Sequence, residues 1–352
     1  MNKSKTAEDL KLRKGTEILP PARLTTGLPS LDLVLGGGWP RGRIVLLAGQ
    51  KESGKSYLAY RAIAEEHKGN PQSIAVLLDA EGCYTPDWGA AIGIDNERLL
   101  VHQPTYMEDA YNTVIAAIDK LRPQIVVLDS LASLAPEKEL EKAFDESKAR
   151  ALAAVLTNSL MRSVQSSINA WRETPSDEAG PHPPVIIIIQ HMYLDPSVPY
   201  LQYVIRGGRT QEYMASLVIE CNQAEGRKSR LFAETETEDG TVERHVGWKF
   251  RWAISKSKVS PSGIPGVYKL YTRDVDGFHA GDCDDSEAIL RLAIQFGIVQ
   301  RKGAWFVFGE EKVQGEERAL KWAEDGRLYP LVAPLVRRLY DLAPPEEVPQ
   351  SD

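Results

Sequence analysis

Short apolar runs rich in β-branched residues recur along the chain and predict buried strands. Runs of this length, bounded by polar or turn-forming residues, are typical of parallel strands that are covered on both faces. The four runs are Ile44–Ala48, Ile74–Leu78, Ile125–Leu128 and Val185–Ile189. Between them, apolar residues recur at helical spacing. The predicted helices are Lys55–His67, Met107–Lys120 and Ser147–Trp171. Alternating strands and helices predict a doubly wound α/β core.

The second half of the chain contains fewer helical patterns and more strand patterns. Further strands are predicted at Leu217–Cys221, Lys249–Ser255 and Gly266–Tyr271. The acidic stretch Glu234–Gly240 is interpreted as the turn of an extended hairpin, and the polar stretch Arg172–Pro184 as a surface loop. These strands extend the same α/β core.

A composition break near residues 281–285 predicts a separate C-terminal unit, which contains a hairpin at Trp305–Phe308. The predicted organisation has four parts. Residues 1–24 form a short N-terminal segment, an oligomerisation arm in which Ala7–Leu12 could form a brief helix. Residues 25–281 form the core, 282–343 a small α+β domain, and 344–352 a Pro- and acid-rich disordered tail.

Composition and charge bear on three further properties: DNA binding, the redox compartment and membrane insertion. The chain has 352 residues, is 43% hydrophobic, and carries a formal net charge of -7, so any DNA binding must come from local patches rather than the overall field. The three cysteines show no zinc or disulfide spacing, which favours a reducing compartment. The longest apolar run is too short to cross a membrane. We therefore expect a cytoplasmic protein without a membrane partner.

Residues 49–56 satisfy the full Walker A pattern, between a predicted strand and a predicted helix. In such loops glycines let backbone N–H groups surround phosphate oxygens, the lysine approaches the β- and γ-phosphates, and the final serine can ligate Mg²⁺. ATP and Mg²⁺ are therefore the expected cofactors. The predicted phosphate-binding residues are Gly49, Gln50, Lys51, Glu52, Ser53, Gly54, Lys55 and Ser56.

Three polar residues follow apolar runs and should meet at the carboxyl edge of the sheet. Asp129 could join Ser56 in holding Mg²⁺, or it could cap the following helical turn. Glu81 could orient or deprotonate the attacking water, or be a solvated acid at a strand end. Gln190 could contact the γ-phosphate, or be a capping or loop residue.

The order of these motifs resembles one family, the RecA recombinases, and is collinear with it over Leu24–Gly326. This resemblance implies the RecA-type P-loop ATPase core. Six segments carry it: Thr26-Gly-Leu-Pro-Ser-Leu-Asp32, Asp79-Ala-Glu81, Leu128-Asp-Ser-Leu-Ala-Ser-Leu134, Gly207-Gly208, Lys256-Ser-Lys258 and Gly303-Ala-Trp305.

The resemblance also implies roles for individual residues. Glu81 matches the family's catalytic glutamate, and Gln190 matches the glutamine that senses the γ-phosphate. Trp88 stands where the family stacks an aromatic ring on adenine, and Tyr271 where an aromatic approaches the base from the adjacent subunit. The pair Lys256 and Lys258 matches the lysines that reach a neighbouring subunit's γ-phosphate, which makes self-assembly part of the expected mechanism.

The lysine pair can also be interpreted from its spacing and charge, without the resemblance. Lys256 and Lys258 occupy alternate strand positions, so they share a face and repel each other unless an anion lies between them. The alternative is a solvated edge strand guarded by lysine.

The segment 193–209 lies where the family's second DNA-binding loop stands. Aromatic side chains can stack on bases and arginines can bind phosphates, which is typical of single-strand binding. The candidate DNA-binding residues are Tyr193, Tyr200, Tyr203, Arg206 and Arg209. Two departures weaken residue-by-residue transfer. The residues straight after Gln190, His191–Leu194, lack the family's basic pair. The first loop, Glu137–Lys148, is charged and helix-prone and lacks the family's glycines.

The leading hypothesis is a divergent RecA-type recombinase, such as one encoded by a phage or mobile element. It would be a DNA-dependent ATPase that coats single-stranded DNA as a filament and pairs it with homologous duplex DNA. One alternative is a RecA-core helicase or loader that forms a ring. The other is a recombination mediator that binds ATP and proteins without exchanging strands.

Overall fold

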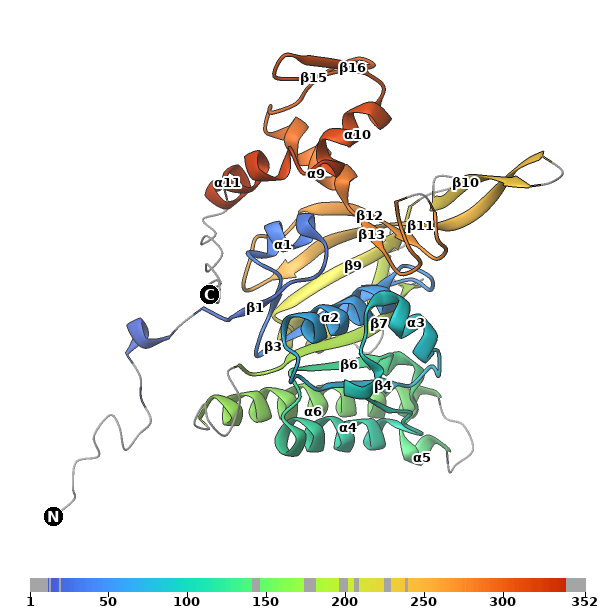
Figure 1. The fold of residues 1–352 in the computed structure, drawn as a ribbon. Coiled ribbons are helices and arrows are strands. Elements are labelled where there is room, and N and C mark those ends of the chain that lie inside the picture. The colour runs from blue at the N-terminus through green and yellow to red at the C-terminus, as the bar shows by residue number, and fades with distance from the viewer. Residues whose placement is uncertain are drawn as a thin grey trace.

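A twisted sheet runs through the body of the protein (Figure 1). The computed structural model describes residues 12, 14–18, 20–140, 146–173, 182–195, 202–205, 209–224, 229–237, 240–275 and 277–339. The sheet order is β13-β12-β11-β9-β3-β7-β6-β4-β5. The strands are β3 (Arg43–Gly49), β4 (Ala75–Asp79), β5 (Leu99–His102), β6 (Ile125–Asp129), β7 (Val185–Asp195), β9 (Leu217–Gln223), β11 (Gly240–Ser257), β12 (Pro265–Tyr271) and β13 (Cys283–Asp284).

The two halves of this sheet differ in strand direction. From β9 to β5 along the order, neighbouring strands are parallel, whereas β9, β11, β12 and β13 pair antiparallel. All four apolar runs of the first half are strands, extended by up to six residues at β7. The α/β fold with a mainly parallel central sheet is thereby confirmed.

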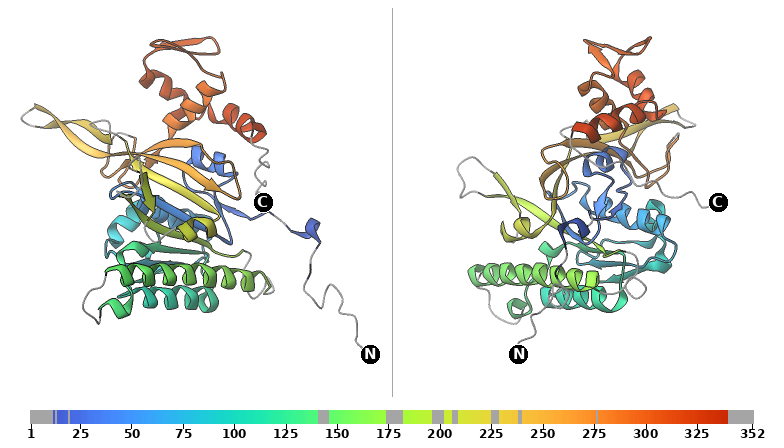
Figure 2. Two further views of the ribbon diagram at one scale, coloured as in Figure 1. Left: turned by 180° about the vertical axis from the view of Figure 1, so that it is seen from behind. Right: turned by 90° about the vertical axis from the view of Figure 1, so that its left-hand side faces the viewer.

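Helices cover both faces of the parallel half, because its strands are apolar on both sides. In β3, Val45 and Leu47 join one buried cluster, and Ile44 and Leu46 join the other. The first cluster includes residues of α1 (Pro29–Leu35) and α2 (Lys55–Gly69). The second includes residues of α4 (Met107–Ala116) and α6 (Glu146–Glu173), which lie side by side in Figures 1 and 2.

The predicted helices are confirmed with small changes of boundary. Helix α4 ends four residues earlier than predicted, because the chain changes to a π-helical turn at Ala117–Leu121. Sequence reasoning missed α1, α3 (Pro86–Ile92) and the edge strand β5. Both helices have only seven residues, too few for periodicity to show.

The extended hairpin is present, but its turn is shorter than predicted. Strand β10 (Arg230–Thr237) pairs with β11 as far as Thr237 and Gly240, so Glu234–Thr237 is strand rather than turn. β-branched Thr235 and Thr237 explain the correction, since threonine favours pleated structure over a tight turn. The hairpin projects from the body in Figure 1.

A small C-terminal unit packs on the body beside α1 (Figure 1). Its elements are α9 (Ser286–Gln295), β14 (Gln300–Lys302), β15 (Trp305–Phe308), β16 (Glu311–Gln314), α10 (Glu316–Glu324) and α11 (Tyr329–Leu339). Buried residues of this unit, including Leu290 and Trp322, belong to the same cluster as α1 and α2. The domain boundary at 281/282 stays a prediction, and β13, just beyond it, still belongs to the large sheet.

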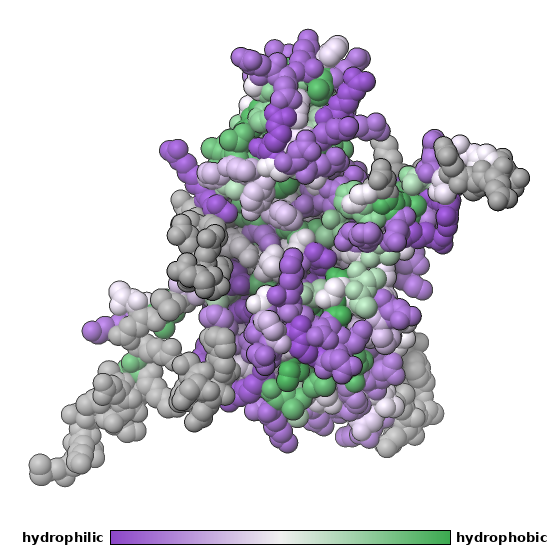
Figure 3. Space-filling model, in the orientation of Figure 1, coloured by the Kyte–Doolittle hydropathy of each residue, from purple (hydrophilic) through white to green (hydrophobic). Residues whose placement is uncertain are grey.

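Hydrophilic residues predominate on the face seen in Figure 3, around a few separate hydrophobic areas. Within the described part of the chain, no helix is long and apolar enough to span a bilayer. The predicted N-terminal helix, apart from Leu12, and the tail 344–352 lie outside the described residues.

Candidate nucleotide site

The predicted phosphate loop connects central strand β3 to helix α2. Gly54 adopts a left-handed conformation, with φ of 84°, immediately before the first helical residue, and Glu52 also has a positive φ of 58°. Such turns direct successive N–H groups into one concavity at a helix N-terminus, where the helix dipole favours anions. The loop backbone therefore has the form that a polyphosphate requires.

An aromatic layer supports the loop from the antiparallel half of the sheet. The Tyr268 hydroxyl donates a hydrogen bond to the Gly54 carbonyl at 3.2 Å, and Phe250 packs on the Tyr268 ring. Loop residues 52–57 and the side chains of Gln223, Trp248 and Phe250 line a pocket of about 350 Å³. This aromatic support was missed by sequence reasoning, because it comes from strands distant in the chain.

Replacing Gly54 with alanine is expected to disrupt the loop. A Cβ atom there would lie 2.4 Å from the Tyr268 hydroxyl and 2.9 Å from the Phe250 ring, in a left-handed conformation that costs a non-glycine residue about 1–3 kcal/mol. We expect a lower Tm and loss of nucleotide binding, measured by thermal denaturation with and without ATP. The matched control is Gly69→Ala in the same helix, where no atom lies within 4 Å. Equal behaviour of the two variants would contradict this account.

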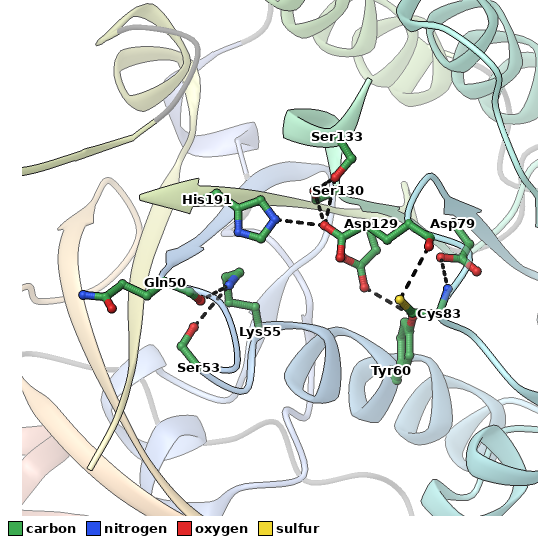
Figure 4. Close-up of polar contacts among 11 residues, drawn as sticks. Gln50, Ser53, Lys55, Tyr60, Asp79, Cys83, Asp129, Ser130, Ser133 and His191 are labelled. Atoms are coloured by element: carbon green, nitrogen blue, oxygen red, sulfur yellow. Dashed lines mark hydrogen bonds and ion pairs between the residues drawn. The ribbon is translucent and has the colours of Figure 1, made fainter. Parts of the chain in front are cut away.

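Lys55 is positioned for an anion. It is 6% exposed, and its Nζ donates to the Gln50 carbonyl at 2.5 Å and to Ser53 Oγ at 3.2 Å, both uncharged (Figure 4). Burial lowers the pKa of Lys55, although the carboxylates of Asp129 and Glu81 partly oppose this. A phosphate anion would supply the missing counter-charge, so the residues present fit a nucleotide.

Asp129 ends β6 beside the start of α2. Its carboxylate accepts a hydrogen bond from the Tyr60 hydroxyl at 3.2 Å and one from Ser56. Burial raises the pKa of Asp129 to about 6, as do the charges of Glu81 and Asp79, against the effect of these hydrogen bonds. The following turn has no side-chain cap, so the helix-capping alternative for Asp129 is wrong.

Ser56 and Asp129 supply two oxygen ligands, which is enough for Mg²⁺ but too few for a metal that is bound by protein side chains alone. The described residues contain no group of three His, Cys, Asp or Glu side chains arranged to bind a metal. Mg²⁺ usually takes one or two protein oxygens and completes its octahedron with phosphates and water. Ser56 and Asp129 would hold the ion in that manner, and cation binding would favour the ionised form of Asp129.

Glu81 lies in the turn after β4, at the same edge. Asp79 orders this turn, because its carboxylate accepts hydrogen bonds from the backbone N–H groups of Cys83 and Tyr84 at 3.1 and 3.0 Å. Glu81 itself is hydrogen-bonded to Ser130, Ser133 and His191 (Figure 4). Burial raises the pKa of Glu81, but these three hydrogen bonds outweigh it and leave the pKa lowered. The carboxylate is therefore ionised and able to accept a proton.

Gln190 is buried, at 2% exposure. Its Nε2 donates to Gln211 Oε1 at 2.9 Å, in helix α8 (Arg209–Met214). Gln190 Oε1 has no hydrogen-bond partner among the described residues. An unpaired buried acceptor is costly. The bond to Gln211 uses one of the two N–H donors of the Gln190 amide, so one donor is left for a γ-phosphate.

Trp88 and Tyr271 come from elements that pack together within one chain. Gly281 N–H donates to the Tyr271 carbonyl at 2.8 Å, and a Cβ on Gly281 would lie 2.2 Å from the Ala91 carbonyl of α3, the helix of Trp88. Trp88 is half-buried against the core cluster, whereas the Tyr271 ring stacks on Phe278 at 4.2 Å. Their contact with adenine stays a prediction.

Lys256 and Lys258 bind the C-terminal end of α8. Lys256 Nζ donates to the carbonyls of Glu212, Tyr213 and Ala215, and Lys258 Nζ donates to the Tyr213 carbonyl at 2.8 Å. Cations are favourable at this end of a helix dipole. Strand β11 lies between β9 and β12 in the sheet order, but its pairing with β12 extends only as far as Ala253. Lys256 pairs with Val218 of β9 and lies beyond that point, so the edge-strand alternative stays a prediction.

Part of the candidate DNA segment forms a ribbon of β7 with β8 (Gln202–Ile205). Tyr193 pairs with Val204 and Tyr203 with Leu194, which places the two tyrosines on opposite faces. Both are about half exposed, at 49% and 47%. Tyr200, Arg206 and the Arg209 side chain lie outside the described residues.

A strand, a glycine-containing phosphate loop and a helix within a mainly parallel sheet define the P-loop class of α/β folds. Residues 11–177 match the family model of the RecA N-terminal domain. The protein RecA of Kineococcus radiotolerans is 30% identical over 318 residues, covering 89% of this chain and 82% of the relative. That of Rippkaea orientalis is 30% identical over 320 residues, covering 90% and 81%. That of Chlorobium limicola is 28% identical over 338 residues, covering 94% and 86%. The chain belongs to the RecA family.

Proposed function

We propose that this protein is an ATP-dependent recombinase that binds single-stranded DNA, pairs it with homologous duplex DNA and releases it after hydrolysis. The observation that carries the proposal is the register of four parallel strands. Gly49 lies abreast of His191, Ala48 abreast of Gln190, and Asp79 abreast of Asp129. This register gathers the phosphate loop, the candidate magnesium ligand and the candidate base at the root of the candidate DNA segment.

Each residue at this edge would have one task. Lys55 and the loop N–H groups would bind the phosphates, and Ser56 and Asp129 would hold Mg²⁺. Bound ATP would supply the transferable phosphoryl group. Glu81 would orient the attacking water and accept its proton, as an ionised carboxylate can. Trp88 would contact the base of the ATP bound by its own chain, and Tyr271 would approach the base bound by an adjacent subunit.

Self-assembly is part of the proposal, because the lysine pair lies far from its own phosphate loop. Trp252 of β11 pairs with Cys221, which pairs with Gly49. Lys256 of β11 and Lys258, the first residue after β11 ends, lie four and six residues further along the chain, about 13–20 Å at the usual rise of a strand. Since β11 runs antiparallel to β9, this displacement leads away from the loop. Any ATP that the lysines reach would belong to another copy, in a filament or a ring.

Strand-exchange competence separates the recombinase from its two alternatives. A circular single strand is incubated with homologous linear duplex, ATP and Mg²⁺, and products are resolved on a gel. We expect joint molecules that require ATP and homology. Duplex unwinding without joint molecules would instead favour a ring-forming motor or loader. ATP and protein binding with neither product would favour a mediator.

Two kinds of DNA contact are expected to differ in salt dependence. Tyr193→Ala and Tyr203→Ala should each weaken single-strand binding by about 1–3 kcal/mol where a base stacks on the ring, with little change in salt dependence. Arg206→Ala and Arg209→Ala should each reduce the slope of log affinity against log salt by about 0.7. Fluorescence anisotropy over a salt series measures both. Unchanged affinity and slope in all four variants would exclude this segment as the DNA site.

A further inference from the structure

One carboxylate oxygen of Glu81 is hydrogen-bonded to three side chains, those of Ser130, Ser133 and His191, which Figure 4 labels. Glu81 Oε1 accepts hydrogen bonds from Ser130 Oγ at 2.7 Å and Ser133 Oγ at 2.9 Å, and His191 Nε2 lies 2.9 Å away. Because the carboxylate is ionised, it can only accept, so Nε2 must carry the proton of the third bond. Oε2 makes no hydrogen bond with the described residues, and it is the oxygen left to accept a proton from water.

Two of the residues that bond Glu81 Oε1, Ser133 and His191, lie next to the two candidate DNA segments. Ser133 ends the 3-10 turn Leu131–Ser133, a few residues before α5 (Glu137–Leu140) opens the first segment. His191 comes directly before Met192, whose pairing with Ile205 begins the β7–β8 ribbon. A shift of the first segment that moves Ser133, or of the second that moves His191, would therefore change the orientation of the Glu81 carboxylate.

The contact between His191 and Glu81 is too exposed to contribute much to the stability of the fold. The side chains of Glu81 and His191 are each 32% exposed, and an ion pair or hydrogen bond this open to water contributes little to folding. It can still restrict the rotamer of a carboxylate. Orientation matters more than stability at a reacting group, because a displacement of about 1 Å can cost about 100-fold in rate.

We propose that His191 is a positioning residue: it fixes Glu81 Oε1, so that Oε2 meets the attacking water, and it ties this orientation to the strand that enters the second candidate DNA segment. The inference rests on the proposed function, in which Glu81 is the base. A change in the β7–β8 ribbon on DNA binding would move His191, and the orientation of Glu81 with it. Hydrolysis would thereby depend on the state of the DNA segment.

The test compares His191→Leu and His191→Gln with the wild type. Leucine removes the donor, whereas glutamine offers an amide N–H near the position of Nε2. The matched control is His102→Leu, which removes another half-exposed histidine that contacts a carboxylate, Asp109, at 3.1 Å. For each protein, kcat and KM for ATP are measured at saturating single-stranded DNA, and DNA affinity is measured with a slowly hydrolysed ATP analogue.

We expect His191→Leu to lose about 10- to 100-fold in kcat, with KM and DNA affinity within twofold of wild type. His191→Gln should recover most of the loss, and His102→Leu should match wild type. A wild-type kcat in His191→Leu would overturn the inference while leaving the proposed function intact. So would a normal kcat at saturating DNA combined with weakened DNA binding, which would make His191 a DNA contact. No DNA-dependent hydrolysis by the wild type would overturn the proposed function itself.

Discussion

Lys55→Ala protein is expected to lose ATP hydrolysis by about 10²–10³-fold or more, the usual effect of removing one preorganised donor from a developing negative charge. In the structure Lys55 is a buried cation of the phosphate loop, and its hydrogen bonds to described residues go to two uncharged oxygens. The alanine variant leaves these oxygens facing the phosphates without a neutralising charge. The measurement is steady-state phosphate release with saturating Mg²⁺ and single-stranded DNA.

Lys68→Ala supplies the control, since it removes an exposed lysine from the other end of the same helix. It should hydrolyse ATP at the wild-type rate. If Lys55→Ala also turned over ATP normally, the nucleotide site would have to lie elsewhere in the molecule.

The double variant Lys256→Ala/Lys258→Ala should bind ATP normally and yet fail to hydrolyse it. Binding should depend on the chain's own loop, whereas Lys256, near the end of β11, and Lys258, just beyond it, lie about 13–20 Å along the chain from the level of that loop. Loss of hydrolysis with retained nucleotide binding is thus the expected signature of a site completed by another copy. Equilibrium binding of a fluorescent ATP analogue and phosphate release measure the two properties.

Mixing this double variant with Lys55→Ala protein makes the test specific. One protein supplies intact phosphate loops and the other intact lysines, so interfaces that join them would recover part of the activity that neither protein shows alone. The mixture must be shown to co-assemble on single-stranded DNA. An inactive mixture that does co-assemble would return the lysine pair to a structural role, capping the end of α8 as the contacts with Glu212, Tyr213 and Ala215 already show.

The parallel half of the fold was predictable because its signals are local. Strands β3, β4, β6 and β7 are buried on both faces, and burial of this kind selects continuous β-branched runs. Strand β5 escaped notice because it has four residues and lies at the sheet edge, where Leu100 and Val101 are exposed. The hairpin turn was misplaced because acidic residues suggested a loop, while the alternating threonines favoured strand pairing.

The residues of the candidate site were predictable where the signal was local, as for the fold. The phosphate loop is a contiguous motif, and Asp129, Glu81 and Gln190 follow strands whose carboxyl ends must meet. Their partners were not predictable. The bond between Gln190 and Gln211, the contact of His191 with Glu81 and the capping of α8 by the lysine pair all join residues distant in sequence. Only the register of the sheet and the packing of α8 bring them together.

Electron microscopy shows directly whether the protein assembles on single-stranded DNA. Wild-type protein is mixed with single-stranded DNA and a slowly hydrolysed ATP analogue, and imaged beside a sample without nucleotide. We expect continuous helical filaments along the DNA that require the nucleotide. Protein that leaves the DNA bare under both conditions would contradict this expectation, whereas closed rings would favour the ring-forming alternative.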